Sequence, residues 1–283
     1  MTNIKPMQVV ENMVQAGTDK AKMQFKDMVV RGALSGALLG FGTTLAFTAE
    51  MQTKLGIIGA LLFPAAFVII ILLGLELVTG NFAFIPLAVL DGKATVKEML
   101  NNWLWVIVGH LIGGSIYASL FVISITNFGA STDHIIARKI IDVAENKTLG
   151  YQALGLAGFI VIIVKAVLCN WMVSLGAVMA MVSKSTSGKI IAMWLPILIF
   201  FAQGFEHAVV NMFVIPAGML LGADVGFNDW WIWNQVPVLI GNVVGGFIFT
   251  GCALYMTYHK EPKKALRFSK TKNNNPVGEA EGF

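Results

Sequence analysis

Long uncharged stretches alternate with short polar segments along the chain. Segments 55–75, 99–132 and 230–259 contain no Asp, Glu, Lys or Arg. A helix needs about 20 apolar residues to cross a bilayer, and these stretches lack the alternation of a transmembrane β-barrel. The pattern therefore predicts an all-α membrane protein with six transmembrane helices, at about 28–48, 56–90, 101–126, 151–182, 190–221 and 234–258.

The second and fifth of these segments contain the same motif. GLELVTGNFAFIP (74–86) and GFEHAVVNMFVIP (204–216) share Gly, Glu, Asn, Ile and Pro at equivalent positions, and GHLIGG (109–114) returns as GNVVGG (241–246). The repeated unit contains three helices, so the second copy enters the membrane in the opposite direction. We predict an inverted 3+3 repeat within one domain, with a substrate site near the midplane, where discontinuous helices meet.

The repeated motif marks the place where the second and fifth helices are predicted to break. Gly74 and Gly80 in the first copy, and Gly204 in the second, permit backbone angles that other residues avoid. Non-helical backbone within a membrane is tolerated only where it lines a cavity or is buried in protein. The prediction is two broken helices that face each other across a pore. The alternative is a continuous, kinked helix at each place.

Polar flanks set the predicted domain limits and the orientation. Residues 1–27 are polar, with apolar residues at roughly helical spacing, which predicts an amphipathic helix on the membrane surface. Residues 28–258 form the transmembrane domain, and residues 259–283 form a basic tail that is predicted to be disordered. Lysine and arginine gather in both terminal segments and in segments 91–100 and 183–189, so both termini are predicted to be cytoplasmic.

Composition agrees with a protein of the cell membrane. The chain is 56% hydrophobic and 13% charged, with a mean hydropathy of +0.73, whereas an average soluble domain carries about 25% charged residues. The net charge of +4 reflects the lysine and arginine of the predicted cytoplasmic segments and does not indicate a nucleic-acid partner. Cys169 and Cys252 lie inside predicted helices, and we interpret both as packing residues rather than as a disulfide.

Four charged side chains occupy matched positions in the two copies. Arg31 and Lys165 lie on the first helices, and Glu76 and Glu206 lie at the breaks. A charge at the centre of a spanning helix costs about 3 kcal/mol on insertion scales. The symmetry therefore predicts two ion pairs, Arg31 with Glu76 and Lys165 with Glu206. These pairs either hold the broken helices in place or, for Lys165, raise the local concentration of anions beside a pathway.

The two breaks differ at one position. The first copy reads ELVT (76–79) where the second reads EHAV (206–209), so the symmetry fails at His207. Its predicted partner across the pore is Thr79. Histidine exchanges a proton near neutral pH, and His207 follows its break directly. The alternative for His207, and our interpretation of His110, is a hydrogen-bonded packing residue.

Four motifs together resemble the formate/nitrite transporter family over residues 28–258: ELVTGN (76–81), KAVLCNW (165–171), GFEHAVVNMFVIP (204–216) and IGNVVGG (240–246). The resemblance implies an aquaporin-like six-helix protomer and a homopentamer in the lipid bilayer, with one pore per protomer. It implies passage of small monovalent anions, with formate preferred here and nitrite, lactate, acetate or hydrosulfide as alternatives. The sequence TGNFAF (79–84) at the first break differs from the serine-rich sequence expected there in formate channels.

The resemblance also implies site residues. A central histidine and a facing threonine correspond to His207 and Thr79, and the pore-lining asparagines correspond to Asn170 and Asn242. The paired charges described above add three more pore residues: Lys165, Glu206 and Glu76. Apolar constrictions on either side of the centre correspond to Phe63, Phe67, Leu77, Val78, Val173 and Phe200.

An apolar constriction restricts how an anion passes. An unpaired anion in a dry apolar site costs far more than a few kcal/mol, whereas protonating an acid of pKa near 4 at pH 7 costs about 4 kcal/mol. The hypothesis is that Lys165 and the half-helix N-termini attract the anion and that His207, or water beside it, supplies a proton. In the alternative, His207 only donates a hydrogen bond and the anion itself passes. A proton-coupled carrier is compatible with the same sequence.

Other functional classes fit the sequence less well. An aquaporin needs NPA signatures at both breaks, and the only Asn-Pro pair is Asn275–Pro276. An ammonium or gas channel is expected to have paired pore histidines, but His110 and His207 lie on non-equivalent helices. A membrane serine protease needs a serine within reach of a histidine base, and Ser35 fits better as a small residue at a helix contact. The scattered histidines predict no metal cluster, and neither an enzyme nor a cofactor is expected.

Overall fold

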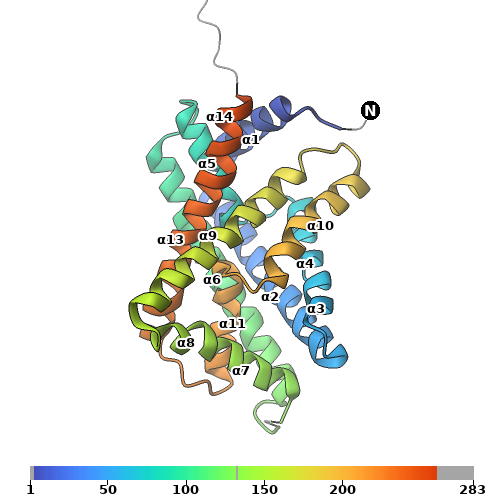
Figure 1. Cartoon of the computed structure of the whole chain (residues 1–283), viewed down its shortest axis with the longest axis vertical. Helices are drawn as coiled ribbons and strands as arrows, with labels where there is room; N and C mark the ends of the chain where they lie inside the picture. The colour runs from blue at the N-terminus through green and yellow to red at the C-terminus, as the bar shows by residue number, and fades with distance from the viewer. Residues whose placement is uncertain (1–2, 132, 260–283) are drawn as a thin grey trace, which may run out of the picture.

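The regular structure of the chain is helical. The computed structural model describes residues 3–131 and 133–259, so the predicted tail lies outside the described residues from position 260 onward. Apart from one isolated bridge between Asn3 and Ser183, the described elements are helices (Figure 1). In chain order they are α1 (Pro6–Ala21), α2 (Phe25–Thr53), α3 (Gly56–Leu62), α4 (Pro64–Leu72), α5 (Val78–Leu90), α6 (Val96–Thr126), α7 (Ile135–Lys147), α8 (Leu149–Gln152), α9 (Gly155–Met179), α10 (Thr186–Ala202), α11 (Ala208–Leu220) and α12 (Phe227–Trp230), followed without interruption by the π-helical turn Trp231–Gln235, α13 (Val236–Val244), the π-helical turn Gly245–Cys252 and α14 (Ala253–Tyr258).

Helix length and composition identify a membrane protein. Among the described residues, four helices are long and apolar enough to cross a bilayer: Phe25–Thr53, Val96–Thr126, Gly155–Met179 and Phe227–Tyr258. Four shorter apolar helices occupy the second and fifth predicted segments: Gly56–Leu72, Val78–Leu90, Thr186–Ala202 and Ala208–Leu220. Large apolar side chains are exposed along these helices, as expected where a surface faces lipid rather than water. The two cysteines are free.

Both copies of the repeated motif adopt the same backbone conformation. The segments 73–77 and 203–207 are non-helical and separate α4 from α5 and α10 from α11. Gly74 and Gly204 have φ of +64° and +63°, a region that a residue with a Cβ atom enters only at a cost. The last residue before each following helix, Leu77 or His207, is extended. The chain therefore makes the same sharp turn twice, and Glu76 and Glu206 lie on it.

Glycine motifs bring the helices of each half into close contact. A methyl group on Gly113 of α6 would lie 1.8 Å from the carbonyl oxygen of Ala33 on α2, and one on Gly245 would lie 2.3 Å from the carbonyl oxygen of Val167 on α9. Such distances leave no space for a side chain, so GHLIGG and GNVVGG serve the same packing purpose. Small residues at helix contacts are typical of membrane bundles.

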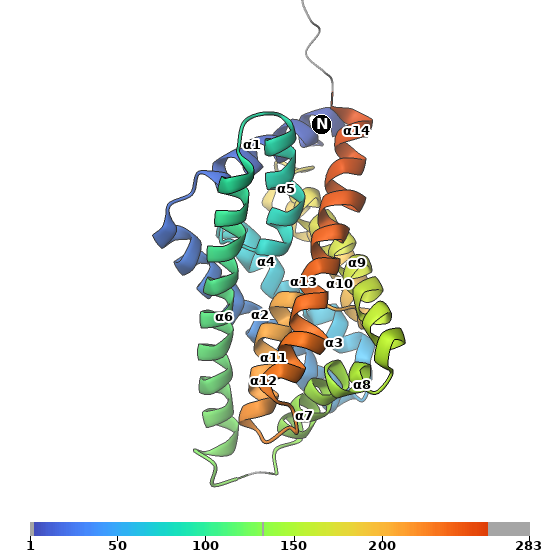
Figure 2. The ribbon, with the colours of Figure 1, turned by 90° about the vertical axis from the view of Figure 1, so that its left-hand side faces the viewer.

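An amphipathic helix precedes each half of the molecule. The helix predicted for the N-terminal segment is present as α1, and its apolar face packs against α5, where a methyl on Gly17 would lie 2.1 Å from the carbonyl oxygen of Phe84. The second helix, α7, was not predicted from the sequence and packs in the same way against α11. Figures 1 and 2 show α1 at one end of the molecule and α7 at the other. The last turn of each of these two helices therefore lies beside one of the non-helical segments, 73–77 for α1 and 203–207 for α7.

Candidate functional site

The two interrupted regions meet inside the protein. The N-termini of α5 and α11 approach each other so that Thr79 Oγ1 lies 3.3 Å from His207 Nε2. Both side chains are buried, with 0% and 3% exposure. The predicted partnership of Thr79 and His207 is thus present as a contact, although its predicted role in transport is a separate matter.

Hydrogen bonds define the tautomer of neutral His207. Its Nδ1 accepts a hydrogen bond from the backbone N–H of Val210, 3.2 Å away, and so caps the first turn of α11. A ring nitrogen that accepts carries no proton, so the proton of the neutral ring lies on Nε2. His207 therefore directs an N–H donor at Thr79. Protonation of Nδ1 would place two donors against each other and break the cap.

His110 has a different environment. Its Nε2 accepts a hydrogen bond from the N–H of Val78 at 3.1 Å, and its Nδ1 lies 2.8 Å from the carbonyl oxygen of Gly32. Both ring nitrogens are thus engaged with the backbone of neighbouring elements. This geometry agrees with the interpretation of His110 as a hydrogen-bonded packing residue that caps α5.

Asn242 and Asn170, predicted to line the pore, hold the backbone around the contact. Asn242 Oδ1 accepts from the N–H of Ala208 at 2.9 Å and caps α11 as His110 caps α5. Asn170 Nδ2 donates to the carbonyl oxygens of Thr79 at 3.0 Å and of Asn242 at 2.6 Å. Because both partners of this nitrogen are acceptors, the orientation of the Asn170 amide is fixed. Its Oδ1 is buried and has no hydrogen-bond partner among the described residues.

The prediction that Arg31 pairs with Glu76 and Lys165 with Glu206 is wrong. Glu76 pairs with Lys20 at 2.5 Å, and Glu206 pairs with Lys147 at 2.7 Å. Arg31 is half-exposed and lies 3.8 Å from Asp27 on its own helix. The cations come instead from the last turns of α1 and α7, since these helices pack against α5 and α11.

Each ion pair belongs to a closed network. Asn81 Nδ2 donates to Glu76 Oε2 at 2.7 Å and to Asn102 Oδ1 at 2.8 Å, and Asn102 Nδ2 donates to the carbonyl oxygen of Lys20 at 2.9 Å. The same bonds recur in the second half at 2.9, 2.8 and 2.9 Å. We call these sets the first network (Lys20, Glu76, Asn81 and Asn102) and the second network (Lys147, Glu206, Asn211 and Asn234). They supply the partners that a buried carboxylate requires.

A cavity adjoins each network. The Glu76 cavity has a volume of about 680 Å³ and is lined by α1, the 73–77 segment and the 183–189 region, including Lys20, Lys184 and Lys189. The Glu206 cavity has a volume of about 500 Å³ and reaches His207. Its charged lining residues are Glu50, Lys139, Lys147, Lys165 and Glu206. Since α1 and α7 lie at opposite ends of the molecule (Figure 2), so do the two cavities.

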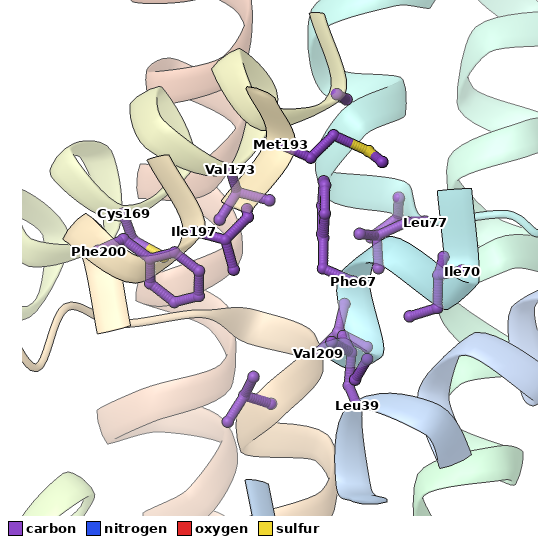
Figure 3. Packing of buried hydrophobic residues seen from close by; sticks show 14 of the residues in the cluster. Leu39, Phe67, Ile70, Leu77, Cys169, Val173, Met193, Ile197, Phe200 and Val209 are labelled. Atoms are coloured by element: carbon purple, nitrogen blue, oxygen red, sulfur yellow. The ribbon is translucent and has the colours of Figure 1, made fainter. Parts of the chain in front are cut away.

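Closely packed apolar side chains lie around the contact. Of the six residues predicted to form constrictions, Phe200 lines the Glu206 cavity, and the other five line neither cavity. The Phe200 ring lies 5.6 Å from the His207 ring, and Phe63 lies 5.7 Å from Phe200. All six are buried in one cluster: Phe63, Phe67, Leu77, Val78, Val173 and Phe200. Figure 3 labels Phe67, Leu77, Val173 and Phe200 among them. The space around the contact is therefore filled by apolar side chains in this conformation.

Sequence reasoning missed the two lysines of the networks. Lys20 lies in the segment predicted to be a surface helix, and Lys147 lies between the third and fourth predicted spans, where no element was predicted. The signal available was that a lysine lies shortly before the first long helix of each half. The asparagines Asn81 and Asn211 were visible as repeat positions, but their partnership with the carboxylates follows only from the packing.

Comparison with known proteins gives one consistent result. The family described as Formate/nitrite transporter matches residues 7–256. The chain is 34% identical to the "Uncharacterized transporter YrhG" of Bacillus subtilis (strain 168), over 92% of this chain and 95% of that protein. It is 32% identical to the "Formate channel BtFdhC" of Bacillus thuringiensis, over 91% of this chain and 96% of that protein.

Solved structures agree with the sequence relatives. An "FNT family ion channel" superposes with a TM-score of 0.77 at 25% identity, covering 88% of this chain and 98% of the other. A "Pentameric formate channel with formate bound" superposes with a TM-score of 0.67 at 22% identity, covering 83% and 98%, and this second likeness concerns the fold. The family match extends over most of the chain and includes both interrupted regions, both networks and the residues between them. The chain therefore belongs to the formate/nitrite transporter family of membrane transporters.

Proposed function

We propose that this protein is a channel for small monovalent anions, formate first among them, in the cell membrane. The observation that carries the proposal is the contact of Thr79 with His207 between two facing helix N-termini. A lysine-bearing cavity lies on each side of it. The formate channel named among its relatives supports the choice of anion.

We propose a matching membrane architecture. Two membrane crossings are broken in this architecture: one consists of α3, α4 and α5, and the other of α10 and α11. Together with the four long helices they make six transmembrane segments in residues 28–258, arranged as an inverted 3+3 repeat. The identical non-helical turns and the two networks support this symmetry. Helix α1 and the end of α14 lie at the same end of the molecule (Figure 1), which supports a common, cytoplasmic side for the N-terminal segment 1–27 and for the tail 259–283. The pentamer named in one structural relative supports a homopentamer here.

The proposed path runs from one cavity to the other past His207. Lysines in both cavities raise the local concentration of anions. Beyond them the anion would leave water for closely packed apolar groups, at a cost far above a few kcal/mol if it stays charged. Taking up a proton at pH 7 costs about 4 kcal/mol for an acid of pKa near 4. Passage as the neutral acid is therefore the less costly route.

We favour the hydrogen-bond role for His207. The capping bond at Nδ1 leaves Nε2–H as the donor, which can point to the carbonyl oxygen of the neutral acid after the acid has lost its water. Giving up this proton would require a new one on Nδ1, at the expense of the cap on α11. In this proposal the substrate's proton comes from water in a cavity. The alternative, in which His207 itself is the proton donor, predicts a different pH response and is tested below.

The anion selectivity decides the proposed function. Purified protein in liposomes should carry formate well above the rate of protein-free liposomes, in a panel with nitrite, lactate, acetate and hydrosulfide. Stronger flux of one of the other anions would reassign the substrate within the same family. A fixed coupling of one proton to each anion against an imposed gradient would indicate a proton-coupled carrier. Flux of none of these anions by folded protein would refute the proposal.

A further inference from the structure

Lys165 is the one lysine of the Glu206 cavity without a carboxylate partner among the described residues. Of the other two, Lys139 pairs with Glu50 at 2.8 Å, and Lys147 pairs with Glu206. Lys165 Nζ instead lies 5.6 Å from the centre of the Tyr151 ring. An ammonium over an aromatic face at this distance is attracted by the ring's quadrupole, so the charge is held in place without being neutralised.

The absence of a Lys165–Glu206 pair requires an explanation, because the two residues are neighbours. The backbone N–H of Glu206 points at the carbonyl oxygen of Lys165 at 3.5 Å. A lysine side chain is long and flexible, and Lys165 and Glu206 line the same cavity. Opposite charges attract strongly when they come close in a partly buried site.

Tyr151 accounts for the separation of these charges. Its hydroxyl donates to Glu206 Oε1 at 2.9 Å, while Lys147 and Asn211 occupy Oε2. The ring of the same tyrosine carries the Lys165 ammonium on its face. Tyr151 is buried, with 8% exposure, at the edge of the Glu206 cavity. Tyr151 therefore contacts both charges. Its hydroxyl occupies Glu206 Oε1, the carboxylate oxygen that Lys147 and Asn211 do not contact, and its ring holds the Lys165 ammonium.

The first half of the molecule has no equivalent arrangement in its described residues. The side-chain donors to the Glu76 carboxylate are Lys20 and Asn81, and Arg31, at the position matched to Lys165, is half-exposed beside Asp27. The Tyr151 contact is thus a departure from the internal symmetry, and it affects only the Glu206 cavity.

We infer that Tyr151 is a positioning residue that keeps Lys165 from pairing with Glu206 and so reserves its charge for an anion entering the Glu206 cavity. The inference rests on the proposed function and extends it to the first step of entry. Without the tyrosine, Lys165 would turn to Glu206 Oε1 and share the carboxylate with Lys147, so its ammonium would no longer be free to attract an entering anion. Entry from this side would weaken, while passage through the centre would not change.

The first test is a double-mutant cycle on formate uptake by whole cells that lack their own formate channels, where the outer face alone meets added formate. We expect Tyr151→Leu and Lys165→Met each to raise KM about fivefold, because one unscreened charge near the entrance is lost, with little change in maximal rate. The double variant should be no worse than Lys165→Met alone. Tyr151→Phe keeps the ring face and should lie between Tyr151→Leu and the wild type. Tyr258→Leu, an exposed tyrosine at the end of α14, is the matched control and should not change KM.

The second test does not depend on transport. Acetylation of Lys165 by acetic anhydride, followed by mass spectrometry, should be slower in Tyr151→Leu than in the wild type, because an ion-paired ammonium reacts less readily. Two results would overturn the inference and leave the proposed function intact. One is a double variant whose increase in KM equals the product of the increases in the two single variants. The other is an unchanged rate of Lys165 acetylation in folded Tyr151→Leu protein. Absence of formate flux in the wild type would instead count against the proposed function, and the acetylation result would still decide the role of Tyr151.

Discussion

Lys147→Met is expected to prevent accumulation of folded protein. The substitution leaves Glu206 as a carboxylate with 2% exposure and no cationic partner. Removing one member of a buried ion pair costs about 3–5 kcal/mol, because the remaining charge is left uncompensated. Lys20→Met should act in the same way through Glu76. The yield of monodisperse protein in detergent and its thermal midpoint measure the effect.

Two further variants distinguish the destabilising effect of an unpaired buried carboxylate from the effect of losing any lysine. The double variant Lys147→Met/Glu206→Gln removes both charges and keeps an amide for Asn211 and Tyr151, so its thermal midpoint should recover toward that of the wild type. Lys139→Met breaks the pair with Glu50, in which both side chains are about a third exposed. Such pairs contribute about 1 kcal/mol or less, so this variant should fold. A Lys147→Met protein as stable as Lys139→Met would show that the second network does not stabilise the fold.

The second large effect is expected at His207. In His207→Phe the ring remains, but the Nε2–H donor toward Thr79 and the Nδ1 cap on α11 are both lost. A hydrogen bond to a neutral substrate is worth about 0.5–1.5 kcal/mol, so formate flux into liposomes should fall by about twofold to tenfold. His207→Asn is the matched variant, because asparagine is a good N-cap and its amide offers a donor but cannot take part in proton exchange near pH 7.

The pH response of His207→Asn decides between the two roles. If His207 donates only a hydrogen bond, this variant keeps much of the flux and the wild-type dependence on pH, because the proton comes from water. If His207 supplies the proton, the variant loses that dependence. Wild-type rate and pH response in both His207→Phe and His207→Asn would eliminate any role of the imidazole. Flux should be normalised to folded protein, since the cap also contributes to stability.

Local sequence signals were sufficient for the all-α class of the fold, and the internal repeat was sufficient for the central contact. The apolar runs indicated long membrane helices, and the repeated Gly-x-Glu text marked two turns whose glycines have nearly equal positive φ. Thr79 and His207 were paired by reading one copy against the other, and the structure brings them within 3.3 Å. Helix length and turn geometry could be predicted because they depend on residues that are near in sequence, whereas the Thr79–His207 contact was predicted from the match between the two copies.

The ion-pair partners of the two buried glutamates could not be predicted from local sequence signals, because other helices contribute them. Symmetry within the spans suggested Arg31 and Lys165 as partners of the two glutamates, whereas the actual partners, Lys20 and Lys147, precede the spans. Their placement depends on how α1 and α7 pack against α5 and α11, a tertiary contact with no local signature. Tyr151 is a still harder case, since it has no counterpart in the first half to draw attention to it.

The central claim is that the substrate passes the contact of Thr79 with His207, and chemical modification of Thr79→Cys in a Cys169→Ala/Cys252→Ser background tests it most directly. Formate flux would be measured in liposomes before and after reaction with a small methanethiosulfonate reagent, with the extent of modification determined by mass spectrometry. The unsubstituted-Thr79 protein in the same background is the control. The account predicts that modified protein loses formate flux while the control retains it. Complete modification of the new thiol with undiminished flux would contradict the proposed path.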